Sequence, residues 1–222
     1  MEARSKKDSR RNEIIDAALK VFSQKEYQDA TISEITKLAG ISEATLYEYF
    51  EGKEDLLFAI PGKITEEGIE FIEQILPYIR GVEGKLRAIV QKYLAVCEEN
   101  PEYTSLIMLQ LRINKKFRST EAFEIIRKGA RLVLECIKEG ILEGTLRQDT
   151  DPYLLRAILL GTIEHLCTRW RMMGVPAKPS IYTDQIVKSV LYGAAAGRDV
   201  KSLSLRVRLD EENETAASKK AP

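Results

Sequence analysis

Side chains that donate hydrogen bonds to phosphate gather between residues 31 and 53. Within this stretch Ser42 can cap a short helix that turns Leu46 and Phe50 inward, so its other face carries small, hydroxyl and phenol side chains. A short helix held across another one has the size of a DNA major groove. We therefore expect contacts with double-stranded DNA from Thr31, Ser42, Glu43, Ala44, Thr45, Tyr47, Tyr49 and Lys53. Packing within a small core is the alternative for either tyrosine.

Basic side chains concentrate in the first eleven residues, where five Lys or Arg face two acids. Residues 1–53 as a whole carry nine Lys or Arg and ten Asp or Glu, a net charge of −1. The positive charge available to a phosphate backbone is therefore local. We expect Arg4, Lys6 and Lys7 to contact phosphate or the minor groove, with an affinity that falls as salt rises. A solvated tail is the alternative for this segment.

Two short helices joined by a tight turn must position these side chains. Thr31 and Glu34 have the spacing of a capping box, so the first of the two begins there. Gly40 follows it, where a left-handed turn residue costs least. A preceding helix over residues 9–24 repeats apolar residues at the spacing of one buried face and can share the same core. We expect a helix-turn-helix domain over residues 1–53.

The rest of the chain carries helical periodicity almost throughout. Asp151-Pro152, for example, reads as a cap followed by the first residue of a helix. The expected helices cover residues 53–79, 83–99, 102–116, 120–143, 152–173 and 181–196. The predicted fold class is all-α, with a helical ligand-binding and dimerisation domain over 54–197 and a flexible tail over 198–222.

Proline at position 61 falls inside the helix that would connect the two domains. It removes one backbone hydrogen bond and clashes with the carbonyl of Leu57, so we expect a kink. A hinge between the domains is the functional interpretation. A helix that ends early and restarts near Lys63 is the alternative.

The last two expected helices are apolar on more than one side, and so need neighbours on more than one side. Small residues at the end of the final helix permit close approach of a partner helix. Two such helices from each of two copies would form a four-helix bundle with two-fold symmetry, so we expect a homodimer. The expected interface residues are Leu154, Gly161, His165, Met172, Gly193, Ala194 and Gly197. Packing within one subunit is the alternative, as it is for the single histidine.

The run from Arg11 to Leu57 resembles the DNA-binding domain of TetR-family transcriptional regulators. The matching segments are IIDAALKVF (14–22), TISEITKLAGIS (31–42) and TLYEYFEGKEDL (45–56). The resemblance implies three helices for DNA, six for a second domain, and a homodimeric repressor on a palindromic operator. Ala44 departs from the glycine usual in the family, for which we expect altered base preference. The second helix of the pair, which begins after Ser42, is the reading helix, the one expected to contact bases. Its Glu43 and Glu48 attract phosphate less than Lys or Arg would.

The second domain places polar side chains among apolar stripes, which is the usual composition of a small-molecule site. Segments 110–115 (QLRINK) and 161–170 (GTIEHLCTRW) resemble the acyl-CoA-responsive TetR repressors of fatty-acid degradation. The resemblance implies a hydrophobic effector, a long-chain acyl-CoA, whose phosphates would meet Lys115, Lys116 or Arg118. We expect ligand contacts from Tyr93, Gln110, Arg112, Lys115, Lys116, Thr162, Arg169 and Trp170.

Plainer interpretations stand beside these ligand contacts. The basic residues 115–118 can be an ordinary solvated helix end. Arg112, a charge within an apolar helix, can instead pair with Glu164. At the level of function, a TetR-like regulator of efflux or of another pathway, sensing a different apolar ligand, is the alternative. A helical protein–protein adaptor that no longer binds DNA is a second one.

Composition argues against several other classes of protein. Hydrophobic residues make up 44% of the chain and charged residues 31%, with a net charge of zero, and no apolar run approaches 18 residues. We therefore expect a soluble cytoplasmic protein that does not enter a membrane. Cys97, Cys136 and Cys167 are scattered in apolar stripes, so we expect buried free thiols.

An enzyme is the alternative from another functional class. A carboxylate di-metal site in a helical bundle needs two Glu-x-x-His motifs, and the chain has one histidine. It has neither a glycine-rich phosphate loop nor a nucleophile elbow. We therefore expect no catalytic residues, no metal and no cofactor.

Overall fold

The structure, a computed structural model, describes residues 2–112 and 114–194 of the chain. All regular elements in these two ranges are helical, as predicted. The α-helices are α1 (Glu2–Gln24), α2 (Ile32–Ala39), α3 (Glu43–Tyr47), α4 (Lys53–Ile75), α5 (Val82–Glu99), α6 (Pro101–Leu106), α7 (Glu121–Leu142), α8 (Pro152–Met173) and α9 (Thr183–Ala194). Shorter helical segments are η1 (Leu76–Tyr78), η2 (Ile107–Leu111), η3 (Lys116–Ser119) and η4 (Pro179–Tyr182). Gly197 and the tail 198–222 lie outside the described residues, as do the side chains of Arg4, Lys6 and Ala194.

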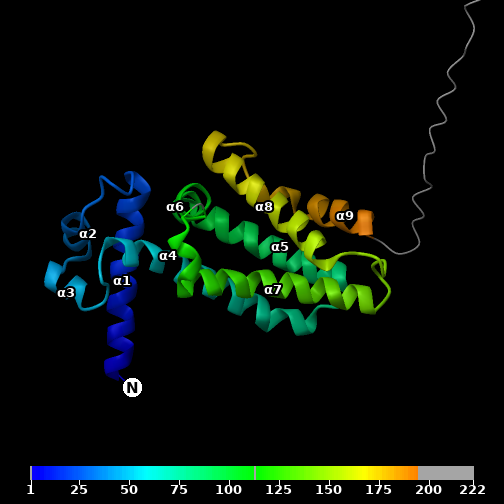
Figure 1. The fold of residues 1–222 in the computed structure, drawn as a ribbon, viewed down its shortest axis with the longest axis horizontal. Helices are drawn as coiled ribbons and strands as arrows, with labels where there is room; N and C mark the ends of the chain where they lie inside the picture. Colours follow the sequence, from blue (N-terminus) through cyan, green and yellow to red (C-terminus); the bar gives the residue numbers. More distant parts are fainter. Residues whose placement is uncertain (1, 113, 195–222) are drawn as a thin grey trace, which may run out of the picture.

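The first three helices form the expected helix-turn-helix unit, with α2 and α3 beside α1 at one end of the molecule (Figure 1). Phe22 and Leu46 fill its core and are at most 1% exposed. The capping box at the start of α2 is present: the Glu34 N–H donates to the Thr31 hydroxyl at 3.2 Å, and the Thr31 N–H donates to the Glu34 carboxylate at 3.1 Å. Gly40 follows α2 with φ 66°, a conformation that favours glycine.

Helix α1 begins at Glu2 rather than at residue 9, so the segment expected as an arm forms the first turns of this helix. Residues 2–11 contain no proline or glycine to interrupt it, and Lys and Arg have high helix propensity. Arg10 pairs with Glu13 three residues later, at 2.6 Å, which supports the same helix.

Helix α4 joins the helix-turn-helix unit to a bundle formed by the remaining helices. It packs against α1 on one side of this junction and against α5 and α7 on the other. In the bundle, α5 contacts both the α4–α7 pair and the α8–α9 pair (Figure 1). A single apolar cluster runs from Ile14 in α1 to Leu191 in α9, so the two parts share a continuous core.

Proline 61 does not interrupt α4, which runs through it for 23 residues. The alternative of a helix that ends early and restarts near Lys63 is therefore wrong. Pro61 and Gly62 are both buried, and a Cβ added to Gly62 would lie 3.5 Å from the side chain of Ile125 on α7. Packing on both sides of the proline holds the helix together despite the missing hydrogen bond. The hinge itself stays a prediction.

The single helix expected over residues 102–116 is wrong, because α6 ends at Leu106 and passes into the π-helical turn η2. The N–H of Arg112 donates to the carbonyl of Ile107, five residues back, at 3.2 Å. Such a turn inserts one residue into a helix and is frequent at functional sites. The chain then restarts as η3, and the Thr120 hydroxyl caps α7.

Two leucines of the helix-turn-helix unit provide a matched test of this packing. Leu46 is fully buried, whereas Leu38 is 53% exposed. We expect Leu46→Ala to lower the free energy of unfolding by about 2–5 kcal/mol, because it leaves a cavity in a small core. Leu38→Ala should change it by less than about 0.5 kcal/mol. Urea unfolding followed by circular dichroism measures both, and equal losses would contradict the placement of α3.

Candidate DNA-reading head and ligand domain

Helix α3 presents to solvent the face that the sequence predicts. Its N-cap Ser42 accepts a hydrogen bond from the Thr45 N–H at 3.0 Å, and its centre is held by buried Leu46. Glu43, Ala44 and Tyr47 are exposed on the opposite side, with Tyr47 at 54%. Thr45 and Tyr49 are half-buried, so for Tyr49 the packing alternative is at least partly realised. Their contacts with DNA stay predictions.

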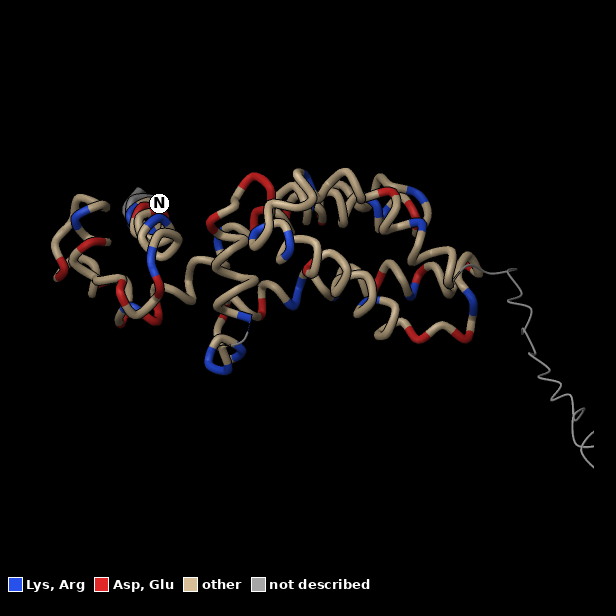
Figure 2. Tube along the Cα trace, turned by 90° about the horizontal axis from the view of Figure 1, so that it is seen from above, with Lys and Arg blue, Asp and Glu red and all other residues tan. Residues whose placement is uncertain are grey.

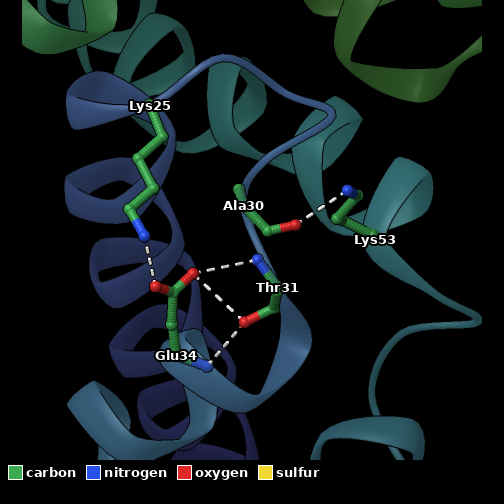
Figure 3. A network of polar contacts seen from close by, with 5 residues as sticks. All are labelled: Lys25, Ala30, Thr31, Glu34 and Lys53. Carbon is green, nitrogen blue, oxygen red and sulfur yellow. Dashed lines mark hydrogen bonds and ion pairs between the residues drawn. The ribbon is translucent and has the colours of Figure 1, made fainter.

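A polar network fixes the start of α2 relative to α1 (Figure 3). Lys25, in the turn after α1, forms an ion pair with Glu34 on α2. The other carboxylate oxygen of Glu34 accepts hydrogen bonds from the N–H and the hydroxyl of Thr31, both at 3.1 Å. The Lys25 ammonium first, and then the Thr31 donors, hold the pKa of Glu34 below its ordinary value of 4.5. The Thr31 hydroxyl expected at phosphate is thus already engaged at the cap.

Lys53, the first residue of α4, also holds the segment between α1 and α2 in place. Its ammonium donates to the carbonyl oxygens of Tyr27 at 2.7 Å and Ala30 at 2.8 Å, and lies 4.5 Å from the centre of the Tyr27 ring (Figure 3 shows the Ala30 contact). This structural role was not predicted, because it joins residues more than 20 positions apart. The phosphate contact proposed for Lys53 stays a prediction.

Basic residues of α1 lie against the segment that follows α3. The Lys7 ammonium is 6.0 Å from the centre of the Tyr49 ring, and the Arg11 guanidinium is 5.0 Å from that of Phe50. Positive charge from α1 therefore lies close to the end of the reading helix. Acidic residues are also present at this end of the molecule (Figure 2).

In the bundle, Arg112 pairs with Glu164 of α8 at 2.5 Å, which confirms the ion-pair alternative. The Arg112 guanidinium also lies 3.8 Å from the sulfur of Met108, on the preceding turn. Near Glu164 lies Tyr93 of α5, and burial, followed by the charges of its neighbours, raises the pKa of its phenol well above the ordinary value. Three elements thus bring a guanidinium, a carboxylate and a protonated phenol together.

Tyr103 joins this interior and was not predicted as a site residue. Its side chain is 7% exposed and its hydroxyl forms a 2.7 Å hydrogen bond with that of Thr65 on α4. Burial raises the pKa of Tyr103, so it too remains a neutral phenol at neutral pH. A tyrosine in the first turn of a short helix carries no sequence signal that separates this role from packing.

The other expected ligand residues are dispersed. Gln110 is half-buried in η2, Arg169 is exposed, and Trp170 is half-buried with the Arg171 guanidinium 5.0 Å from its ring centre. Thr162 is exposed and its hydroxyl donates to the carbonyl of Ile158. It therefore lies away from the Arg112–Glu164 pair and on the outer face of α8.

Basic residues in and just before η3 form a separate group at the edge of the bundle. Lys115, Lys116 and Arg118 are exposed, and Lys116 pairs with Glu54 in the first turn of α4 at 2.9 Å. This pairing raises the pKa of Lys116. The expected cluster therefore exists, and one of its members already contacts the helix that leads to the reading head.

The outer faces of α8 and α9 enclose an open groove of about 720 Å³. Its lining includes Ile158, Gly161, Thr162 and His165 of α8, Tyr182 of η4, and Gln185 and Ser189 of α9. Of the residues expected at a dimer interface, Leu154 is 60% and Met172 65% exposed, and Gly161, His165 and Gly193 are exposed too. The inward stripe Leu155, Leu159 and Ile163 is buried, so α8 has two distinct apolar sides.

The three cysteines are free and buried, as predicted. Burial raises the pKa of the Cys136 thiol to about 11, so it stays protonated. No helix within residues 2–112 and 114–194 is long and apolar enough to cross a membrane. In the same residues no three acidic, histidine or cysteine side chains gather as metal ligands.

Known proteins resemble both parts of this chain. Residues 14–60 match the family model of bacterial regulatory proteins of the tetR family, and residues 63–190 match that of the YsiA-like protein C-terminal region. A fatty acid metabolism regulator protein of Bacillus subtilis is 28% identical over 160 residues, 72% of this chain and 82% of that protein.

Solved structures resemble it over a similar length. The transcriptional regulator FadR of Bacillus subtilis in complex with stearoyl-CoA superimposes with a TM-score of 0.76 and 26% identity, over 82% of this chain and 97% of that one. The fatty acid degradation regulator FadR of Bacillus halodurans gives a TM-score of 0.75 and 26% identity, over 82% and 98%.

The network around Glu34 predicts how acid affects the reading head. A carboxylate with a lowered folded-state pKa stabilises the fold above its unfolded pKa, and this contribution is lost as pH falls through the folded-state value. Thermal stability should therefore fall as pH drops below about 4.5, and fall less steeply in Glu34→Gln, which is already weaker at neutral pH. Glu26→Gln is the control, since the exposed Glu26 carboxylate makes no ion pair with described residues. Melting curves from pH 3 to 7 that coincide for wild type and Glu34→Gln would count against the network.

Proposed function

Because the chain belongs to the TetR family of bacterial regulatory proteins, we propose that this DNA-binding transcriptional regulator is a homodimeric repressor of fatty-acid metabolism genes. A long-chain acyl-CoA would release it from a palindromic operator. The observation that carries the proposal is a helix-turn-helix head joined to a helical domain whose fold and sequence resemble those of a regulator in complex with stearoyl-CoA. A repressor of this kind acts where the DNA is, in the cytoplasm.

The arrangement of the head supports DNA contact through α3. Ala44 and Tyr47 are exposed and available to base edges, and Lys7 adds positive charge near Tyr49. The methyl group of Ala44 changes the surface offered to the bases by little, so base preference rather than binding should differ from relatives with glycine there. Phosphate contacts by lysine and arginine make the affinity dependent on salt.

The bundle supports a ligand with an apolar chain and a phosphate-rich head. Its core consists of closely packed aliphatic side chains. Half-buried Tyr93 and Glu164 and the exposed Arg112 add polar groups beside it. The phenol of Tyr93 stays protonated and can donate to an acyl carbonyl oxygen. Lys115, Lys116 and Arg118 at the edge of the bundle suit the phosphates of CoA.

The outer side of α8 and α9 supports a second copy of the chain as partner. Large apolar side chains are exposed there around a groove, among them Ile158 at 49% and Leu154 at 60%. Exposed apolar patches of this kind mark interaction surfaces. A two-fold dimer through this side would present two reading helices to half-sites roughly 34 Å apart.

Release of DNA requires that the ligand bind the two arrangements of the head with different affinity. The contacts of α1 with α4 and α6 are the physical connection through which the bundle and the head bias one another. An acyl chain that inserts between the bundle helices next to α6 would change this packing.

A gel-shift titration against the DNA upstream of the protein's own gene tests the proposal directly. We expect a complex that weakens as salt rises and that dissolves at micromolar stearoyl-CoA. Coenzyme A without its acyl chain is the control and should leave the complex intact. A complex indifferent to stearoyl-CoA would keep the DNA-binding function and redirect the search to another apolar effector. Absence of any complex with the upstream DNA would favour an adaptor.

Two similarly exposed apolar residues test the dimer. Ile158 on α8 is 49% exposed and Phe71 on α4 is 47% exposed. We expect Ile158→Glu to give a monomer at micromolar concentration, because two charges would be buried across a two-fold axis. Phe71→Glu should leave the dimer unchanged. Sedimentation velocity measures the mass of each, and a dimeric Ile158→Glu variant would place the interface elsewhere.

A further inference from the structure

The short segment η3 is anchored to the bundle by one aromatic residue and is otherwise basic. Phe117 is 2% exposed, and its ring centre lies 5.7 Å from that of Phe58 on α4 and 5.8 Å from that of Phe123 on α7. Lys116 and Arg118 flank it in the chain, and both are exposed. The anchor holds the cations in place while leaving their charged ends free to change partner.

Only one of the three cations has an acidic partner among the described residues. The Lys116 ammonium lies 2.9 and 3.1 Å from the two carboxylate oxygens of Glu54. Lys115 and Arg118 make no such pair. Lys116 and Glu54 are 72% and 42% exposed, so the pair lies at the surface, where an anion arriving from solvent can compete for it.

Glu54 is adjacent to the brace that positions the reading head. Its neighbour Lys53 holds the carbonyl oxygens of Tyr27 and Ala30, and Ala30 directly precedes Thr31, the N-cap of α2. The charges of Glu54 and Lys116 both act on the Tyr27 phenol, which places them near this turn. Two contacts therefore connect Lys116 to the start of α2: Lys116 with Glu54, and the neighbouring Lys53 with Ala30.

We propose that the Lys116–Glu54 ion pair is an exchange switch, in which the phosphates of the effector take Lys116 from Glu54 and so release the start of α4. The proposal rests on the proposed function, since it needs an effector that carries phosphates. Ligand and Glu54 cannot both hold the ammonium, so binding of one weakens binding of the other. Lys115 and Arg118 add charge for the phosphates without competing for Glu54.

The size of the effect follows from the exposure of the pair. Surface ion pairs contribute little, and breaking one corresponds to a factor of roughly two to five in an equilibrium constant. The switch therefore supplies a part of the coupling between effector and DNA, and packing changes in the bundle supply the rest. Its signature, the effect that distinguishes it, is that changes at Glu54 or Lys116 alter the affinity for a ligand with phosphates and not for one that has only the acyl chain.

Two probes and two variants isolate this signature. Stearoyl-CoA carries the phosphates, whereas stearoyl-pantetheine keeps the acyl chain and thioester without them. Without DNA, we expect Glu54→Gln to bind stearoyl-CoA two- to five-fold more tightly than wild type and stearoyl-pantetheine equally well. Lys116→Gln should bind stearoyl-CoA more weakly, again with no change for stearoyl-pantetheine. Isothermal titration calorimetry on the full chain measures the affinities of wild type and both variants for both probes.

A matched control comes from another ion pair between the same helix and the bundle. Glu73 of α4 pairs with Lys128 of α7 at 2.8 Å, with 37% of its side chain exposed. Glu73→Gln should bind both probes as wild type does. In gel shifts, Glu54→Gln should also lose less DNA affinity on adding stearoyl-CoA than wild type and Glu73→Gln do.

The outcomes separate the switch from the function on which it rests. Wild type that binds both probes, with Glu54→Gln binding stearoyl-CoA no more tightly, would overturn the switch and leave acyl sensing intact. The same shift with stearoyl-pantetheine would also overturn it, since phosphate would then have no part. Binding of neither probe by wild type would overturn the proposed effector and the switch together.

Discussion

One helix, α4, packs both in the helix-turn-helix unit and in the bundle, and the rest of the structure depends on this sharing. Leu56 and Ile60 in its first half and Ile69 in its second half are buried, while the helix packs on α1, α5 and α7. Burial of each such side chain stabilises the fold by about 1.5–3 kcal/mol. Separating the head from the bundle would therefore expose apolar surface, at a cost in free energy larger than a single ligand contact can offset. Any motion of the head must be a shift of packed helices against one another.

Polar contacts across the same junction are weaker and can be exchanged. Lys63 of α4 pairs with Asp16 of α1 at 2.8 Å, and Lys116 pairs with Glu54, both at the surface. Surface ion pairs contribute at most about 1 kcal/mol. The apolar core thus determines which helices pack together, while surface charges bias small differences in their orientation. A regulator needs both, because a signal must change the geometry without unfolding the protein.

The parts of the fold that could be predicted from sequence are those specified by neighbouring residues. The capping box at Thr31, the glycine turn at Gly40 and the two-sided character of α8 each arise within one or two helical turns. The π-helical turn η2 could not be predicted, because the apolar periodicity of its residues is that of an ordinary helix; the turn packs against α8 in the folded chain. It places Arg112 where Glu164 can reach it, an ion pair the sequence left open as an alternative. The Lys25–Glu34 and Lys116–Glu54 pairs join residues 9 and 62 positions apart, which become neighbours only in the folded chain.

The acidic side chains in and just after α3 have a consequence for how the protein searches a chromosome. Non-specific binding to DNA comes from phosphate neutralisation, and a genome offers millions of competing sites. Glu43 is exposed on the reading helix and Glu48 directly follows it, and residues 1–53 carry a net charge of −1, so random sequence attracts this head weakly. A smaller share of the molecules is then held at irrelevant sites. Under the proposed function, fewer copies per cell would be needed to keep an operator occupied. Under the same proposal, these charges would make occupancy depend on the match between α3 and the bases rather than on general attraction to the backbone.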